Sequence, residues 1–218
     1  MKTRQRPQRA RSLLARLQLG LEALYRVETR LPIDAFVIDD EARERFNPAR
    51  TPREQLLLRE GDGELGMALF VDATALANLE RHDPAARLDD HNFSDFCLAV
   101  EGVSHFVYVA LAAACQRSVS QLELELQAEV DKFVCCLLMT DVASDLRGRL
   151  FGDVRYAADL DAAESERYRT ANRQADRYAA ALERRFVIRA DTGALLAEVR
   201  RFYRMDLPDK LGRIAQLA

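Results

Sequence analysis

The chain has 218 residues, of which 49% are hydrophobic and 31% are charged, a composition that is ordinary for a soluble globular protein. Its pI of about 5.7 argues against a dedicated nucleic-acid-binding protein, for which a pI above about 9 is usual. Negative charge is concentrated in residues 51–152, where 8 basic side chains stand against 17 acidic ones. Arg outnumbers Lys by 29 to 3, a bias that indicates a GC-rich bacterial genome.

A basic tail and an amphipathic helix open the chain. Residues 1–11 combine Arg and Lys side chains with Gln and Pro7, which predicts a disordered tail. Leucines recur at spacings of three and four between Leu14 and Leu24, so we expect a helix over residues 12–29. Charged side chains interrupt this apolar run, which is atypical of a secretory signal. The sequence therefore favours a cytoplasmic protein.

Cysteine spacing supports the same compartment. No two cysteines form a C-x-x-C pair, which argues against a zinc ribbon or a thioredoxin-type motif. We expect free thiols that pack as small hydrophobic side chains in a reducing environment. The cysteines are Cys97, Cys115, Cys135 and Cys136.

A small sheet is predicted between the first helix and the middle of the chain. Gly61 and Gly63 mark a tight turn between two apolar runs, which is typical of a β-hairpin. Residues 39–53 are polar and contain two prolines, so we expect a loop there with at most a turn of helix. The sheet should be antiparallel and three-stranded. Its strands are expected at residues 33–38, 55–59 and 64–72.

Two largely apolar helices, at residues 92–115 and 119–142, are predicted to form the centre of the fold, after a short helix at residues 73–81. Apolar residues recur at helical spacing from Phe93 to Leu111 and cover most of the first helix. That helix is long enough to cross a membrane, but the charged and polar groups within it oppose insertion. We therefore expect core helices and no membrane insertion.

One polar strip on these helices is the best candidate for a chemical site. Glu101 and His105 lie on the first helix, while Glu125 and Glu129 lie on the second. Such side chains on neighbouring helices can hold iron, manganese or zinc, or perform acid–base catalysis. The carboxylate di-iron pattern requires two Glu-x-x-His motifs, and the sequence has none. We therefore expect a buried hydrogen-bond network without a metal or other cofactor, and keep a metal or acid–base site as the alternative.

The C-terminal part is predicted to be helical, with a long helix at residues 153–186, a second at 193–204 and a short one at 210–217. The inward stripe of the long helix is rich in Ala and therefore buries little area. Its other faces carry Arg and Tyr, the residue types that are enriched at protein interfaces. A weak nucleic-acid interaction is the alternative use of these side chains. The predicted partner-binding residues are Tyr168, Arg169, Arg173 and Arg177.

These patterns predict a helix-dominated α+β fold, with about six helices around the central pair and a small antiparallel sheet. Residues 12–218 should form one globular domain, in which residues 153–218 follow the central pair found in 12–152. No nucleophile-elbow, P-loop, Rossmann or zincin motif is present. The sequence therefore favours a non-enzymatic accessory subunit of a bacterial multi-protein system, which binds a protein partner or a second copy of itself. An enzyme that uses the Glu/His strip is the alternative.

Overall fold

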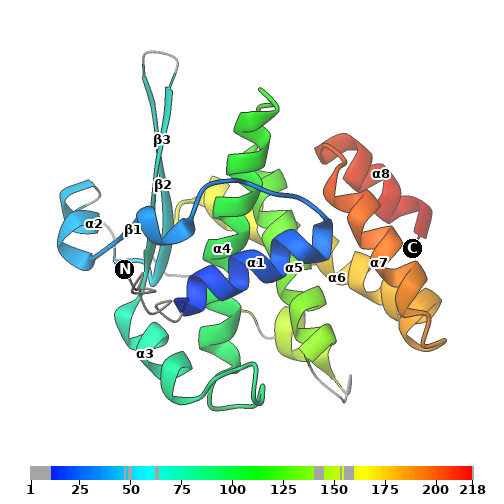
Figure 1. Cartoon of the computed structure of the whole chain (residues 1–218). Helices are drawn as coiled ribbons and strands as arrows, with labels where there is room; N and C mark the ends of the chain where they lie inside the picture. The colour runs from blue at the N-terminus through cyan, green and yellow to red at the C-terminus, as the bar shows by residue number, and fades with distance from the viewer. Residues whose placement is uncertain are drawn as a thin grey trace, which may run out of the picture.

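The computed structural model of the chain describes residues 11–46, 48, 51–61, 64–139, 145–152, 154 and 160–217. Figure 1 shows a helix-dominated α+β fold, which confirms the predicted class. The predicted disordered tail lies outside the described residues except for Arg11. The α-helices are α1 (Leu13–Tyr25), α2 (Asp40–Phe46), α3 (Ala73–Arg81), α4 (Phe93–Ala114), α5 (Gln121–Met139), α6 (Ala162–Leu182), α7 (Thr192–Tyr203) and α8 (Leu207–Leu217). Shorter helical turns are η1 (Ile33–Ala35), η2 (Gly148–Gly152) and η3 (Glu183–Val187).

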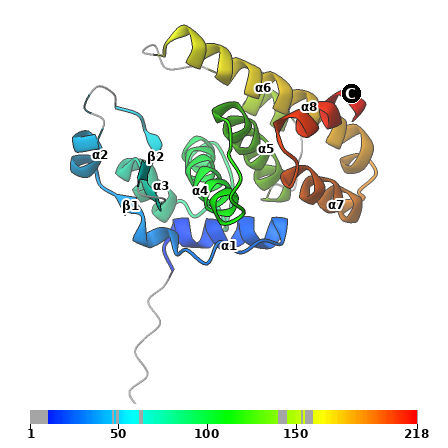
Figure 2. The same cartoon turned by 90° about the horizontal axis from the view of Figure 1, so that it is seen from above.

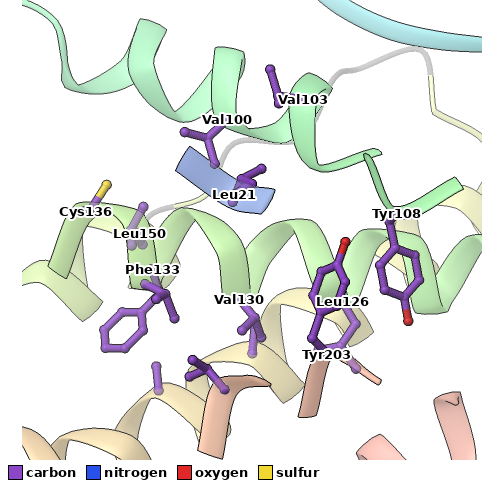
Figure 3. Packing of buried hydrophobic residues seen from close by; sticks show 14 of the residues in the cluster. Leu21, Val100, Val103, Tyr108, Leu126, Val130, Phe133, Cys136, Leu150 and Tyr203 are labelled. Atoms are coloured by element: carbon purple, nitrogen blue, oxygen red, sulfur yellow. The ribbon is translucent and has the colours of Figure 1, made fainter. Parts of the chain in front are cut away.

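The helices are layered around the central pair α4 and α5 (Figure 2). α1 packs against α4 on one side of the pair, and α6 packs against α5 on the other. α7 contacts α1, and α8 contacts α6, so the C-terminal helices close one end of the fold. In Figure 3, Val130 and Phe133 of α5 point toward α6, while Val100 of α4 lies beside Leu21 of α1. The predicted central position of the helix pair is confirmed.

Most helix starts follow from capping residues that can be read in the sequence. The side chains of Ser12, Asp72 and Asp191 each accept a hydrogen bond from a backbone N–H in the first turn of α1, α3 and α7. Such caps satisfy amide groups that have no partner within the helix. α6 begins with a reciprocal pair, in which Asp161 accepts from the Glu164 N–H and Glu164 accepts from the Asp161 N–H.

Helix ends are set by residues with left-handed backbone conformations. Arg26 has φ of 54° and ends α1 at Tyr25, four residues before the predicted end at residue 29. Gln116 has φ of 52° after the end of α4, at the predicted break between the two central helices. A left-handed residue turns the chain out of the helical path, and neither position is a glycine that would have revealed it.

The long C-terminal helix is shorter than predicted. Asp161 lies outside the helix and caps it, so α6 begins at Ala162 rather than at residue 153. Most of residues 153–159, and the predicted end of α5 at residues 140–142, lie outside the described residues. The regular helix ends at Leu182 and continues as the π-helical turn η3, close to the predicted end at 186. The helices predicted at 193–204 and 210–217 are confirmed as α7 and α8, the latter beginning three residues earlier.

The sheet is mixed rather than antiparallel, which corrects the prediction. The predicted hairpin is present, since β2 (Glu54–Gly61) and β3 (Glu64–Val71) pair antiparallel in register. β1 (Val37–Ile38) pairs parallel with β3, giving the order β1-β3-β2. β1 and β2 run in opposite directions, but they are not neighbours in the sheet. β3 lies between them, antiparallel to β2 and therefore parallel to β1.

The connection between β1 and β2 contains the seven-residue helix α2, where a loop with at most a turn of helix was expected. The side chain of Asp39 accepts a hydrogen bond from the Ala42 N–H, and acidic residues fill the first turn. Arg43 of α2 is buried, and its guanidinium lies 5.3 Å from the centre of the Phe70 ring on β3. Arg43 therefore contacts β3 on the side away from α4, because Leu69, the neighbour of Phe70, lies against Gly102 of α4. The full length of α2 was not predicted because the segment has little apolar periodicity.

Helix α4 is the one described helix that is long and apolar enough to cross a membrane, and 72% of its most apolar window is buried within the fold. Core helices of soluble proteins meet the same criterion, so the absence of membrane insertion stays a prediction.

Candidate functional site

The contact between α4 and α5 carries polar side chains on two sides. The two helices are antiparallel. Tyr108, late in α4, contacts Glu123 at the start of α5, whereas Glu101, earlier in α4, contacts Lys132 further along α5. On one side lies a group that we call the glutamate cluster. It consists of Glu54 from β2, Glu101 and His105 from α4, and Glu125, Glu129 and Lys132 from α5.

Lys132 is the centre of one half of the glutamate cluster. Its Nζ donates to Glu101 Oε2 at 2.9 Å and to Glu129 Oε1 at 2.8 Å. The paired carboxylates raise the pKa of Lys132 well above its usual range despite burial. The expected hydrogen bond between Glu101 and the second helix is therefore present, although 25% of the Glu101 side chain is exposed.

His105 is the centre of the other half and lies between two carboxylates. Nδ1 is 3.5 Å from Glu54 Oε1, and Nε2 is 3.6 Å from Glu125 Oε2. These are ion-pair distances that are too long for good hydrogen bonds, so His105 Nε2 and Glu54 Oε1 are buried without a hydrogen-bond partner. Burial opposes protonation of His105, but Glu54 and Glu125 outweigh it and raise the pKa of the imidazole well above its usual value. Burial also raises the pKa of Glu54.

The glutamate cluster gives no support to the metal alternative. The predicted metal ligands Glu101, His105, Glu125 and Glu129 do converge, but the ammonium of Lys132 lies between two of them. Within the described residues, no group of three or more His, Cys, Asp or Glu side chains is arranged to hold a metal ion. What the cluster can do chemically is hold charge, because a protonated His105 and Lys132 offset part of the negative charge of the glutamates.

A second polar group, which we call the lysine network, occupies the other side of the α4–α5 contact and was not predicted. Lys210 of α8 is fully buried, with 0% of its surface exposed. Its Nζ donates to Tyr108 Oη and to Gln127 Oε1, both at 2.7 Å. Gln127 in turn donates to Asp131 at 2.7 Å. The network joins α1, α4, α5 and α8 through Tyr25, Ser104, Tyr108, Glu123, Gln127, Asp131 and Lys210.

Burial strongly perturbs the pKa values of Lys210 and Asp131 in the lysine network. Burial lowers the pKa of Lys210 to about 7, although Glu123 and Asp131 act in the opposite direction. Burial likewise raises the pKa of Asp131 to about 6, against hydrogen bonds donated by Ser104, Tyr25 and Gln127. Buried ionisable groups with such pKa values occur at functional sites and also in structural networks. Here Lys210 joins α8 to α4 and α5, and Asp131 joins α5 to α1 and α4, while the bond from Gln127 to Asp131 lies within α5.

The α5 part of the lysine network is visible in the sequence, but the contribution of Lys210 is not. Glu123, Gln127 and Asp131 recur every four residues on α5 and form a polar row beside the row of Glu125 and Glu129. That second row was overlooked because the apolar stripe was assigned first. Lys210 could not be assigned to it, because no local pattern relates a residue on the last helix to one about 80 positions earlier.

The predicted partner-binding residues do not all lie on the same face of α6. Arg169, Arg173 and Arg177 are exposed and follow one another every four residues, so they form a row along the outer surface. Tyr168 is half-buried beside the row. Burial and the charges of Glu125 and Glu101 raise the pKa of its hydroxyl. We call the three exposed residues the arginine row.

An open groove of about 560 Å³ lies between the tip of the β2–β3 hairpin and the corner where α4 joins α5. In Figure 1 this hairpin projects beyond the helices. The apolar lining includes Leu58, Leu65, Val109, Ala112 and Leu124. The groove was not predicted, because its walls come from segments that are distant in the sequence.

No protein-family model, no curated protein and no solved structure matches the chain.

Proposed function

We propose that the protein is a non-enzymatic accessory subunit of a bacterial multi-protein system and that it binds an acidic segment of a protein partner through the arginine row on α6. The observation that carries this proposal is the exposed position of Arg169, Arg173 and Arg177 at one residue per turn of a helix that is anchored on α5 and α8. Arginine is enriched at interface hot spots because its guanidinium binds carboxylates through paired hydrogen bonds.

The charges of the row are available to a partner. Within the described part of the chain, Arg169 and Arg177 make no ion pair, whereas Arg173 lies 3.3 Å from the exposed carboxylate of Glu166. An unpaired guanidinium can bind a carboxylate without first losing an internal partner. An acidic partner would also be steered toward the row, at a rate that falls with ionic strength.

The structure also changes the reason for expecting a partner. The Ala-rich stripe of α6 needs no other chain to cover it, because Ala171 and Ala175 are buried against neighbouring helices of the same chain. The proposal therefore rests on the outer face of α6 alone. It makes Tyr168 a residue at the margin of the interface rather than one of its central contacts.

Charge reversal tests the proposal. A tagged chain with Arg169→Glu, Arg173→Glu and Arg177→Glu should retain its circular dichroism spectrum and lose its partner in affinity capture from the native host. The matched control is Arg59→Glu, Arg81→Glu and Arg189→Glu, which changes net charge equally at exposed positions elsewhere. Each exposed ion pair contributes ~0.2–1 kcal/mol, so the loss of three should weaken binding by about threefold to a hundredfold.

Light scattering on the same samples identifies self-association. If wild type is a dimer that only the arginine-row variant disrupts, the partner is a second copy of the chain. Equal capture of the same partner by wild type, the arginine-row variant and the control would overturn the proposal.

A further inference from the structure

We propose that Cys97 and Cys136 are a redox-modification site, at which a hydroperoxide converts two neighbouring thiols into a disulfide that joins the central helices. This inference is independent of the proposed partner binding. It starts from the antiparallel pairing of α4 and α5, which places Cys97 opposite Cys136 at the end of the pair that lies away from the connecting loop.

The two sulfur atoms are in contact. Cys97 Sγ and Cys136 Sγ lie 4.0 Å apart and share a weak hydrogen bond. A disulfide requires about 2.05 Å, so closure needs the two side chains to turn toward each other by ~2 Å. Figure 3 shows Cys136 on α5 beside Leu150, and both residues belong to the buried cluster. The contact joins residues 39 positions apart in the chain.

The other cysteines compete poorly for this bond. Cys115 is exposed, but it is 18 residues from Cys97 on the same helix, which corresponds to ~27 Å along the axis. Cys135 precedes Cys136 directly in α5, and a bond between adjacent residues would distort the helical backbone. Only Cys97 approaches Cys136 from another element.

The two thiols differ in access, which sets the order of reaction. Cys97 is partly exposed, whereas Cys136 is completely buried, with 0% of its surface accessible. The hydrogen bond with Cys97 and burial together raise the pKa of the Cys136 thiol, although the nearby charge of Arg149 acts in the opposite direction. Since the thiolate is the reactive form, Cys97 meets the peroxide first and Cys136 reacts second.

The reaction is a two-electron oxidation. The sulfur of Cys97 attacks one oxygen of the hydroperoxide, so that an S–O bond forms and the O–O bond breaks. The other oxygen leaves with a proton as water or an alcohol, and Cys97 becomes a sulfenic acid. Cys136 Sγ then attacks the Cys97 sulfur, so that the S–S bond forms and the S–O bond breaks. The hydroxide leaves as water with the proton of Cys136. Both electrons pass from the thiols to the peroxide.

The disulfide would fix the register of α4 against α5 and lower the conformational entropy of the unfolded chain. The glutamate cluster and the lysine network lie between the two cysteines and the loop that connects α4 to α5. The disulfide would therefore link the two helices at the end opposite to that loop. In a reducing cytoplasm such a bond is transient and reports oxidant exposure, as cytosolic disulfides generally do.

The test uses hydrogen peroxide and the full-length protein. After treatment with stoichiometric peroxide, mass spectrometry should find a chain lighter by two hydrogen atoms. Alkylation should then modify two of the four cysteines, and digestion should release a Cys97–Cys136 cross-linked peptide. The melting temperature should rise by about 5 °C or more and return when dithiothreitol reduces the bond.

Variants distinguish the pair from general thiol oxidation. Cys115→Ser should form the bond like wild type. Cys97→Ser should neither form it nor gain stability, and Cys136→Ala should stop at a sulfenic acid on Cys97 that dimedone traps. The proposal is overturned if wild type yields sulfinic acid at Cys97, a Cys115-linked dimer or a bond that uses Cys135 while the Cys97–Cys136 peptide is missing.

Discussion

Single residues in this protein matter most where an ionisable group is buried between helices. Lys132 and Lys210 show how the surroundings of a buried lysine can either raise or lower its pKa. Lys132 lies between Glu101 and Glu129, which keep it charged, whereas Lys210 donates to neutral oxygen atoms of Tyr108 and Gln127. Burial is therefore the dominant effect at Lys210 and lowers its pKa. At Lys132 the two paired carboxylates dominate and raise the pKa.

This difference predicts a pH effect on stability. The pKa of Lys210 falls from an ordinary 10.5 in the unfolded chain to about 7 in the folded protein. Between these values the unfolded state binds more protons, so the Lys210 contribution to the free energy of unfolding rises as pH increases from 7 to 10. The rise is on the order of 4 kcal/mol, because one pKa unit corresponds to ~1.4 kcal/mol.

Urea unfolding of wild type and Lys210→Met at several pH values measures this contribution. The difference in unfolding free energy between the two proteins should move in favour of wild type as pH rises from 7 to 10. Lys132→Met is the control, because Lys132 stays protonated over that range and its difference from wild type should be constant. Parallel pH profiles for wild type and Lys210→Met would show that the buried amine is not the cause.

At the scale of residues, the sequence predicted four members of the glutamate cluster, did not include Glu54 from β2, and missed the lysine network. Glu101, His105, Glu125 and Glu129 stood out because they interrupt apolar helices that are adjacent in the chain. Lys210 did not, since its helix is amphipathic and a single Lys on such a helix is normally solvated. Its burial follows from where α8 lies in the fold, which is tertiary information that periodicity does not contain.

Helices and strands were predicted correctly where a capping residue, a turn glycine or a regular apolar spacing marks them in the sequence. Asp72, Gly61 and the apolar stripe of α4 each produced a correct element. The antiparallel direction predicted for β1 was wrong, because strand direction depends on the path of the connection rather than on the strand itself. The start of α6 was wrong because the capping pair of Asp161 and Glu164 was overlooked within a run of helix-forming residues.

That capping pair predicts a local effect at the start of α6. Asp161→Ala removes the acceptor for the Glu164 N–H, which lies 2.8 Å from Asp161 Oδ1. We expect a loss of ~1 kcal/mol in unfolding free energy and a fall of about 2–4 °C in melting temperature. Hydrogen exchange should accelerate in the first turn of α6 only.

Ser165→Ala is the matched control, since it alters the same turn without removing the cap. An unchanged exchange rate in the first turn of Asp161→Ala would show that α6 is held by packing alone. Faster exchange throughout α6 would instead mean that the cap stabilises the arginine row as well.

For the whole molecule, the class of fold could be predicted from composition and helical period, but the function could not. The charged face of α6 is visible in the sequence, yet whether it faces solvent depends on how α6 sits on α5 and α8. The structure places Arg169, Arg173 and Arg177 outside and the Ala stripe inside. We propose that this outer face is where a partner binds.

Site-specific photo-crosslinking in the native host tests that claim most directly. A photoreactive amino acid replaces Arg173 in the arginine row and, in the control, Arg59 on the β2–β3 hairpin, both of which are exposed. We predict that ultraviolet light joins the chain to one defined partner or to a second copy from position 173, and that position 59 gives no such product. A partner that cross-links from position 59 while position 173 yields only the unmodified chain would contradict the account.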